Sequence, residues 1–205
     1  MPMNLKGYII PNDYVDIFRM MKIDATSPGE VEAWLKSDDP DKTLRINSGG
    51  GSMFAGIEMY SLIKEHGAVN VFISGEACSA ASIAAIAGRT VKISPPAMMM
   101  IHNVSMGARG DKNAMKHAAM SLDECDSAIS QAYQLKTGLD ESVLLDLMNK
   151  ETWMSAKKAK SYGFVDEIAF EKGQEPQVFN AKAQLAVNIN TNLRRNITNG
   201  LARNA

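Results

Sequence analysis

The sequence is poor in the residues that would mark a disulfide-rich, metal-binding or nucleotide-binding protein. Of its 205 residues only Cys78 and Cys125 are cysteine and three are histidine. Two cysteines fit a reducing compartment such as the cytoplasm and provide no disulfide framework. No Cys/His spacing is typical of a zinc site, and neither a P-loop nor a GxGxxG pattern occurs. We therefore expect no metal and no cofactor.

Long apolar runs and an excess of one charge are also missing. No run reaches the 18 apolar residues of a membrane-spanning helix, and the stretch from Met1 to Lys6 lacks a signal-peptide pattern. The formal net charge is -1, with 45% hydrophobic and 22% charged residues. These values are typical of a globular domain without general affinity for nucleic acid or membrane. The length fits one ordinary domain with room for an appendage.

The chain does contain an alternation of buried-strand patterns and helical patterns. Apolar runs at 44–46 and 69–74 predict strands, and each is followed by glycine and then by a helical pattern, at 53–66 and after Gly75. This order favours an α/β fold with parallel strands. Further strands are expected at 8–10, 89–94, 95–103 and 165–168, and further helices from Ser27, over 111–136, over 141–149 and from Ser155 to Tyr162.

The stretch from Gly75 to Gly88 is the one around which the rest is organised. The Ala-rich segment after the strand predicts a helix with Ser79 at or near its N-terminus. Unpaired N–H groups and the helix dipole favour negative charge there. A serine in that place suits acyl transfer, because an oxyanion beside it meets donors that are already aimed. The alternative is an N-cap serine on a packing helix.

Three glycines, Gly49 to Gly51, lie between the strand at 44–46 and the following helix. Glycines permit positive φ and let backbone N–H groups come close to a ligand. A phosphate cradle is one reading, although no Lys-Ser/Thr pair follows. The others are an oxyanion-hole loop, a clamp on a bound peptide backbone, or a plain sharp turn.

One histidine differs from the other two in its setting. His66 falls in the last turn of a helix and His117 on a solvated helix, whereas His102 ends an apolar strand. An imidazole there needs a partner, either in the core or in a catalytic site.

The last part of the chain changes in composition. The helix over 111–136 is long enough to project or to pack on another subunit. Residues 172–205 carry five Lys or Arg against one Glu, a charge of +4, and are rich in Asn. We expect a domain over 1–170 and a basic, flexible tail over 171–205.

Four motifs in order give the chain a family resemblance. They are Asn47-Ser48-Gly49-Gly50-Gly51, Gly75-Glu76-Ala77-Cys78-Ser79-Ala80, Met100-Ile101-His102, and Trp153-Met154-Ser155-Ala156 followed by Gly163-Phe164-Val165-Asp166. Over roughly residues 6–170 the chain resembles the Clp protease proteolytic subunit family, and most closely its phage and prophage head maturation branch. The resemblance implies a Clp protease/crotonase fold with repeated ββα units, and a protruding handle helix at 111–136.

The resemblance also implies a set of site residues. Ser79 matches the nucleophile and His102 the general base, while Gly50 and Ala80 match the backbone donors of the oxyanion hole. Gly49 and Gly51 are expected to bind substrate backbone. The family's acid aligns with Glu151, where the family usually has Asp; Asp146 and Asp166 are the weaker candidates.

The function implied is a serine endopeptidase, with phage prohead maturation as the first expectation and work with an ATP-dependent unfoldase as the alternative. An acyl-CoA enzyme of the crotonase fold and a non-catalytic ring or scaffold protein are two further classes. Expected partners are a protein substrate, further copies in a heptameric ring or stacked tetradecamer, and a capsid, scaffold or unfoldase protein. No nucleic acid or membrane is expected.

Overall fold

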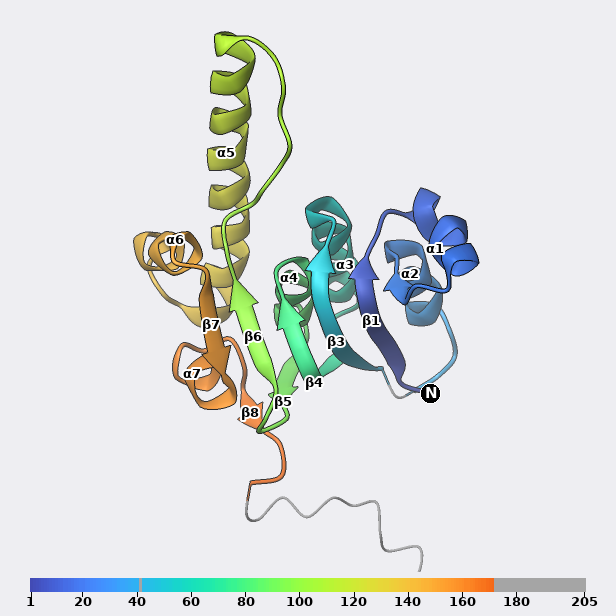
Figure 1. Ribbon diagram of the computed structural model, residues 1–205. Helices are drawn as coiled ribbons and strands as arrows, with labels where there is room; N and C mark the ends of the chain where they lie inside the picture. The colour runs from blue at the N-terminus through green and yellow to red at the C-terminus, as the bar shows by residue number, and fades with distance from the viewer. Residues whose placement is uncertain (41, 172–205) are drawn as a thin grey trace, which may run out of the picture. The chain divides into compact units, whose positions relative to one another are not determined.

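A computed structural model describes residues 1–40 and 42–171 (Figure 1). The strands are β1 Met3–Ile9, β2 Ala25–Thr26, β3 Thr43–Gly51, β4 Asn70–Cys78, β5 Thr90–Ile93, β6 Met98–Ile101, β7 Thr152–Ser155 and β8 Glu167–Ile168. The helices are a 3-10 turn η1 Asn12–Tyr14 and α1 Val15–Met21, α2 Pro28–Leu35, α3 Met53–His66, α4 Ala80–Ile86, α5 Lys112–Thr137, α6 Glu141–Asn149 and α7 Ala156–Ser161.

One sheet organises these elements. Its order is β2-β1-β3-β4-β5-β8, with β6 beside β4 and β7 beside β6. The pairing of β6 with β7 is antiparallel, and every other pairing in the described residues is parallel. The predicted α/β class with parallel strands is therefore confirmed.

Strand β4 lies at the centre because it changes partner halfway. Its first half pairs with β5 and its second half, from Glu76 to Cys78, pairs with β6. The expected turn at Gly75 is wrong, since the strand runs on to Cys78. A Cβ at Gly75 would lie 2.2 Å from Asn47 Oδ1, whose oxygen accepts from Glu76 N–H at 3.2 Å. Glycine is needed here for a close approach between strands.

The triple-glycine segment is also strand and not loop. Side chains along β3 alternate between buried and exposed up to Gly51, and Gly50 and Gly51 pair with Tyr8 and Ile9 of β1. A Cβ at Gly51 would lie 2.2 Å from Ile9 O. We predicted a loop here because glycine has a low strand propensity. In the structure, pairing with β1 overrides that tendency.

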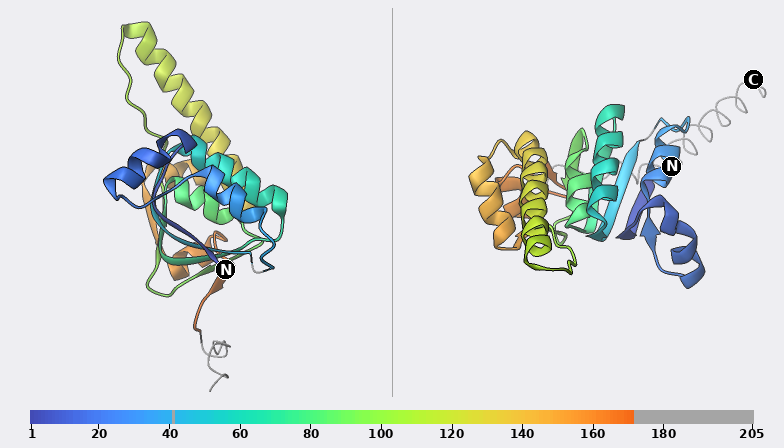
Figure 2. Two further views of the ribbon diagram at one scale, coloured as in Figure 1. Left: turned by 90° about the vertical axis from the view of Figure 1, so that its right-hand side faces the viewer. Right: turned by 90° about the horizontal axis from the view of Figure 1, so that it is seen from above.

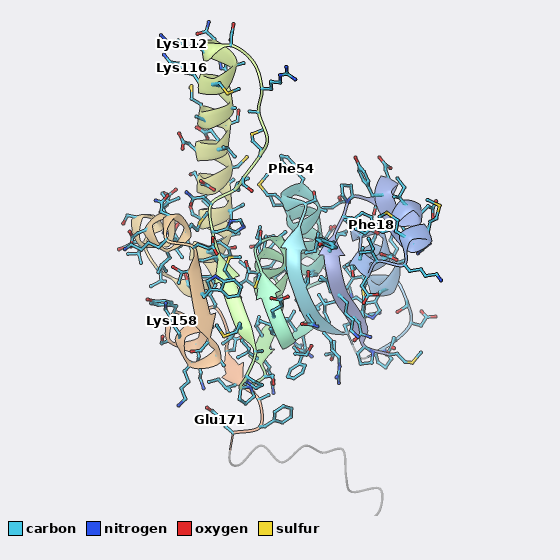
Figure 3. The ribbon with its side chains drawn as sticks, in the orientation of Figure 1. Phe18, Phe54, Lys112, Lys116, Lys158 and Glu171 are labelled. Carbon is cyan, nitrogen blue, oxygen red and sulfur yellow. The ribbon has the colours of Figure 1, made fainter. Side chains whose placement is uncertain are left out.

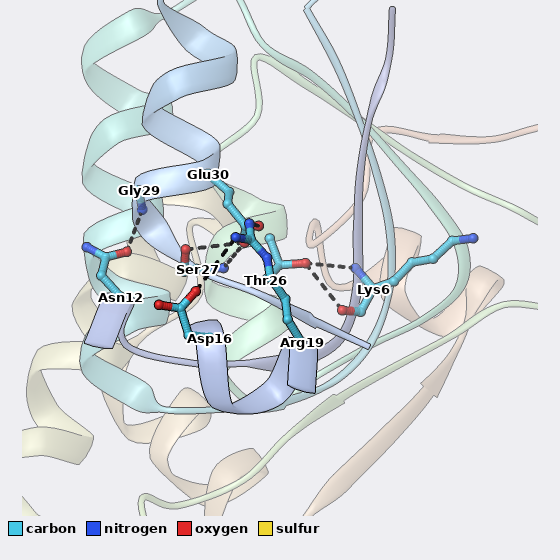
Figure 4. A network of polar contacts seen from close by, with 8 residues as sticks. All are labelled: Lys6, Asn12, Asp16, Arg19, Thr26, Ser27, Gly29 and Glu30. Carbon is cyan, nitrogen blue, oxygen red and sulfur yellow. Dashed lines mark hydrogen bonds and ion pairs between the residues drawn. The ribbon is translucent and has the colours of Figure 1, made fainter. Parts of the chain in front are cut away.

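The start of α2 follows its predicted capping box. Ser27 N–H donates to Glu30 Oε2 at 2.9 Å, and Glu30 also pairs with Arg19 of α1 at 3.1 Å (Figure 4). Asn12 Oδ1 accepts from Gly29 N–H at 2.8 Å. These bonds attach η1 and α1, which the sequence did not predict, to α2.

Helices α2, α3 and α4 pack side by side on one face of the sheet, whereas α5 projects (Figures 1 and 2). The predicted long helix is confirmed. Its far end carries Lys112 and Lys116 (Figure 3), and its buried side chains all belong to the half from Asp126 onward. The first half of α5 has no covering layer within the described residues.

Residues 1–169 form one compact unit. Residues 172–205, which make up nearly all of the predicted tail over 171–205, lie outside the described residues. The predicted division of the chain after residue 170 therefore stays a prediction. Among the helices that the structure describes, none combines the length and apolar character needed to cross a bilayer.

Candidate active site

Ser79 is the single residue between the end of β4 and the start of α4. Its backbone has φ +53° and ψ -126°, a region that non-glycine residues rarely adopt. Its N–H donates to Met100 O at 2.9 Å, which fixes the turn against β6. Ser79 holds the N-cap position, but its side chain makes no capping hydrogen bond. The strained turn presents the hydroxyl outward, as in a nucleophile elbow.

The hydroxyl of Ser79 contacts His102 directly. His102 follows β6, and the pairing of Cys78 with Met100 brings the ends of β4 and β6 together. The distance from His102 Nε2 to Ser79 Oγ is 2.8 Å. A serine within hydrogen-bond reach of an imidazole is the geometry of an activated nucleophile and its base. The structure thus brings together the two residues that the sequence placed in these roles.

A buried hydroxyl pair supports the nucleophile from behind. Ser82 Oγ donates to Ser79 O at 2.6 Å and lies 2.7 Å from Tyr133 Oη of α5. Tyr133 is 2% exposed and packs edge-on against Phe164, and burial raises the pKa of its phenol. The phenol therefore stays neutral and links α5 to α4. The sequence analysis missed Tyr133; a tyrosine on the buried side of a long helix was the available signal.

We expect Tyr133→Phe to destabilise the fold by about 1 kcal/mol, because it removes one buried hydrogen bond and leaves Ser82 bonded to Ser79 O. The free energy of unfolding in urea measures this. Tyr14→Phe is the control, since Tyr14 is 51% exposed and should change stability by less than about 0.5 kcal/mol. Equal stability of the two variants would contradict a role for the buried phenol.

None of the three sequence-predicted acids forms a hydrogen bond or ion pair with His102 within the described residues. Glu151 is exposed, has φ +46°, and accepts from Trp153 Nε1 at 3.2 Å. Asp146 pairs with Lys150 at 2.5 Å. Asp166 accepts from Val91 N–H at 2.6 Å and pairs with Lys136 at 2.7 Å. The assignment of Glu151 as the acid stays a prediction.

A fourth carboxylate, Asp126 of α5, lies beside the histidine segment. Asp126 is 8% exposed, and its Oδ1 accepts from Val104 N–H at 2.7 Å. Burial raises the pKa of Asp126, while the Val104 N–H and the nearby charge of His102 act to lower it. Sequence reasoning missed this residue, although an acidic side chain between Leu122 and Ile129 on the apolar side of a helix was a readable signal.

The two expected oxyanion donors lie next to Ser79. Ala80 is the first residue of α4, so its N–H has no intrahelical acceptor. Gly50 is packed against the elbow: a Cβ there would lie 2.8 Å from Ser79 Cβ and 3.0 Å from Ala80 N. The N–H of Gly50 donates to Ser48 Oγ at 3.1 Å, so this donor is shared or must be released before it binds an oxyanion.

A cavity of about 370 Å³ opens beside the Ser79–His102 pair. Its wall includes Gly51 together with apolar side chains from α3 and α5, namely Met53, Phe54, Leu122 and Ile129. Phe54, labelled in Figure 3 at the start of α3, is largely exposed. Gly51 therefore lies at the cavity, and its role in substrate binding stays a prediction. Gly49, which was also expected to bind substrate, and Gly50, the expected oxyanion donor, line a separate hollow with Lys6, Asp24 and Glu76.

The cysteine beside the nucleophile is not an alternative to it. Burial and the adjacent Glu76 carboxylate raise the pKa of Cys78 to about 12. A thiol with such a pKa stays protonated and weakly nucleophilic at neutral pH. Across residues 1–40 and 42–171 we find no group of three or more His, Cys, Asp or Glu that could hold a metal ion.

Comparison with known proteins gives one family. A sequence model described as Clp protease matches residues 17–172. Three relatives, all called "ATP-dependent Clp protease proteolytic subunit", come from Pleurastrum terricola, Bacteroides fragilis and Bacteroides thetaiotaomicron. The first is 30% identical over 140 residues, covering 67% of this chain and 71% of the relative. The others are 29% and 28% identical over 164 residues, covering 76% of this chain and 79% and 74% of the relatives.

Proposed function

The chain belongs to the Clp protease family and is a serine-type peptidase, and from this premise we propose that it is the proteolytic subunit of an ATP-dependent protease complex. The observation that supports this best is the 2.8 Å contact between Ser79 Oγ and His102 Nε2 at a strained strand-to-helix turn. In this proposal Ser79 is the nucleophile and His102 the general base.

The chemistry follows from the placement of these groups. Ser79 Oγ attacks the carbonyl carbon of a peptide bond while His102 Nε2 accepts its proton, and the imidazolium then gives that proton to the departing amine. The N–H groups of Ala80 and Gly50 receive the oxyanion, each worth about 3 kcal/mol of barrier. A water molecule then attacks the acyl-enzyme in the same way, with His102 accepting its proton, and this step releases Ser79.

The cavity indicates which substrates bind. Since Met53, Phe54 and Ile129 line the space next to Ser79, an apolar side chain before the scissile bond removes more apolar area from water there than a charged one. The exposed edge near Gly51 is suited to an extended substrate backbone.

The relatives favour the unfoldase alternative over phage head maturation. Their names state ATP dependence, and neither those names nor the family description refers to a phage, a capsid or a scaffold. A homo-oligomeric ring is part of the proposal, because Met120 and Leu135 of α5 are 63% and 81% exposed. Apolar side chains on a projecting helix are suited to contacts with further copies of the chain.

The test uses the purified full chain. We expect it to hydrolyse a short fluorogenic peptide with leucine before the scissile bond faster than one with aspartate, without nucleotide. It should degrade a folded protein only when an ATP-dependent unfoldase and ATP are added. Sedimentation velocity should place the active fraction in a closed oligomer.

Each contrary result points to another class. Degradation of folded protein without ATP would indicate an independent protease. Hydrolysis of acyl-CoA thioesters without peptide cleavage would indicate an acyl-CoA enzyme of the crotonase fold. Failure to react with a fluorophosphonate probe would indicate a non-catalytic ring or scaffold protein.

A further inference from the structure

We infer that Asp126 of α5, and not Glu151, is the carboxylate that orients His102. This inference rests on the proposed roles of Ser79 and His102 and adds to them a positioning residue on the projecting helix. It departs from the acid position that the family resemblance implies.

The backbone places the Asp126 carboxylate beside the histidine. Val104, two residues after His102, donates its N–H to Asp126 Oδ1 at 2.7 Å, which ties α5 to the segment leaving β6. His102 uses Nε2 for Ser79. Within residues 1–40 and 42–171, neither His102 Nδ1 nor Asp126 Oδ2 has a hydrogen-bond partner. A Ser-His-acid triad joins these two remaining atoms.

The two side chains are within range for their charges to interact but form no direct hydrogen bond. The inference therefore requires a side-chain rotation that closes the Nδ1–Oδ2 contact while the Val104 bond holds the carboxylate in place. Rotation about χ2 of either residue is a soft degree of freedom. Catalytic hydrogen bonds are often long in a free enzyme and tighten in the complex with substrate.

Burial makes the carboxylate responsive to the state of the histidine. Asp126 is 8% exposed, so ionisation there is costly unless a cation is close. The charged neighbours that act on Asp126 are Asp123, one turn away on α5, and His102 from the β6 segment. When His102 takes the Ser79 proton, the imidazolium becomes the cation that offsets this cost.

The side chain of Glu151, and not the position of its backbone, sets it apart from Asp126. The antiparallel pairing of Ile101 with Thr152 puts the Glu151 backbone across from His102, but its side chain is exposed and accepts from Trp153 Nε1. An exposed carboxylate without a hydrogen bond to His102 neither fixes the ring nor interacts with it strongly.

The test compares Asp126→Asn with Glu151→Gln in the full chain. The Asn retains an oxygen that can accept from Val104 N–H, so the fold should persist, as thermal melting will show. We expect Asp126→Asn to lower kcat for the fluorogenic peptide by about 10²- to 10⁴-fold with little change in KM. Glu151→Gln should stay within about twofold. Asp123→Asn is the matched control, because it removes a neighbouring charge from the same helix.

A second readout does not depend on activity. The chain has three histidines, so proton NMR can follow the ring signals of each. Because the inference joins His102 Nδ1 to Asp126, Asp126→Asn should shift the ring signals of His102, and Glu151→Gln should leave them in place.

The inference is overturned if Glu151→Gln is inactive while Asp126→Asn is active, or if the His102 ring signals do not move in Asp126→Asn. Failure of the proposed function looks different: wild-type protein would then neither cleave peptide nor react with a fluorophosphonate, while the NMR comparison would still decide whether Asp126 acts on His102.

Discussion

Ser79→Ala is expected to remove peptide hydrolysis almost completely, with a fall in kcat on the order of 10⁶-fold. The variant loses the atom that attacks the carbonyl and leaves His102 without its hydroxyl partner. Alanine has a Cβ as serine does, so it tolerates φ +53° about equally well, and stability should change by no more than about 1 kcal/mol. Peptide hydrolysis, labelling by a fluorophosphonate and sedimentation velocity measure the three consequences.

Ser82→Ala is the matched control for this experiment. Ser82 lies in the same helix but its Oγ is buried against Ser79 O and Tyr133 Oη, out of reach of a substrate. We expect Ser82→Ala to lose some stability and to keep fluorophosphonate labelling. Full activity of Ser79→Ala together with an inactive Ser82→Ala would show that the nucleophile was assigned to the wrong serine.

The features of this fold that depend on local pattern were predictable from the sequence. The capping box at Ser27 and Glu30 and the helix over 111–136 were expected and are present. The contact of Ser79 with His102 was also expected, although from resemblance and not from spacing alone. Parallel strands made it plausible, because their carboxyl ends meet at one edge of a sheet.

The extent of β3 and β4 was not predictable, because glycine carries no local signal for strand. Gly50, Gly51 and Gly75 are drawn into the sheet by neighbours: Tyr8 and Ile9 pair with the first two, and Asn47 packs against the third. Each glycine sits where a Cβ would collide with another strand. Such close approaches depend on tertiary packing that a single sequence does not display.

The identity of the carboxylate that orients His102 was the part of the site that the sequence predicted least well. Glu151 lies at the aligned position, but the structure engages it with Trp153. Asp126 belongs to a helix that was considered only for assembly, and its proximity to His102 depends on how α5 packs against the segment after β6. Linear spacing gives no measure of that packing, so its relevance emerged only in three dimensions.

The second large effect is expected from Gly50→Ala. A Cβ at Gly50 would lie 2.6 Å from Cys78 O and 2.8 Å from Ser79 Cβ, and the backbone there has φ +98°. The new methyl group must push the elbow or the end of β3 out of place, and it does so in a backbone region that costs a non-glycine residue about 1–3 kcal/mol. We expect kcat to fall by about 10²- to 10⁴-fold, because both the position of Ser79 and one oxyanion donor are disturbed.

Gly49→Ala provides the control, since the two substitutions add the same atom one residue apart. At Gly49 the nearest atom to a new Cβ is Glu76 Oε1 at 3.7 Å, an ordinary contact. Gly49 and Gly50 both line the hollow beside Lys6 and Glu76 and not the cavity of Ser79 and His102, so the comparison isolates packing against the nucleophile. Gly49→Ala should therefore keep activity within about threefold of the parent and lose little free energy of unfolding, within about 0.5 kcal/mol. If Gly50→Ala retained full kcat, close packing of Gly50 against the nucleophile would have no part in catalysis; if Gly49→Ala lost as much as Gly50→Ala, Gly49 would contact the substrate after all.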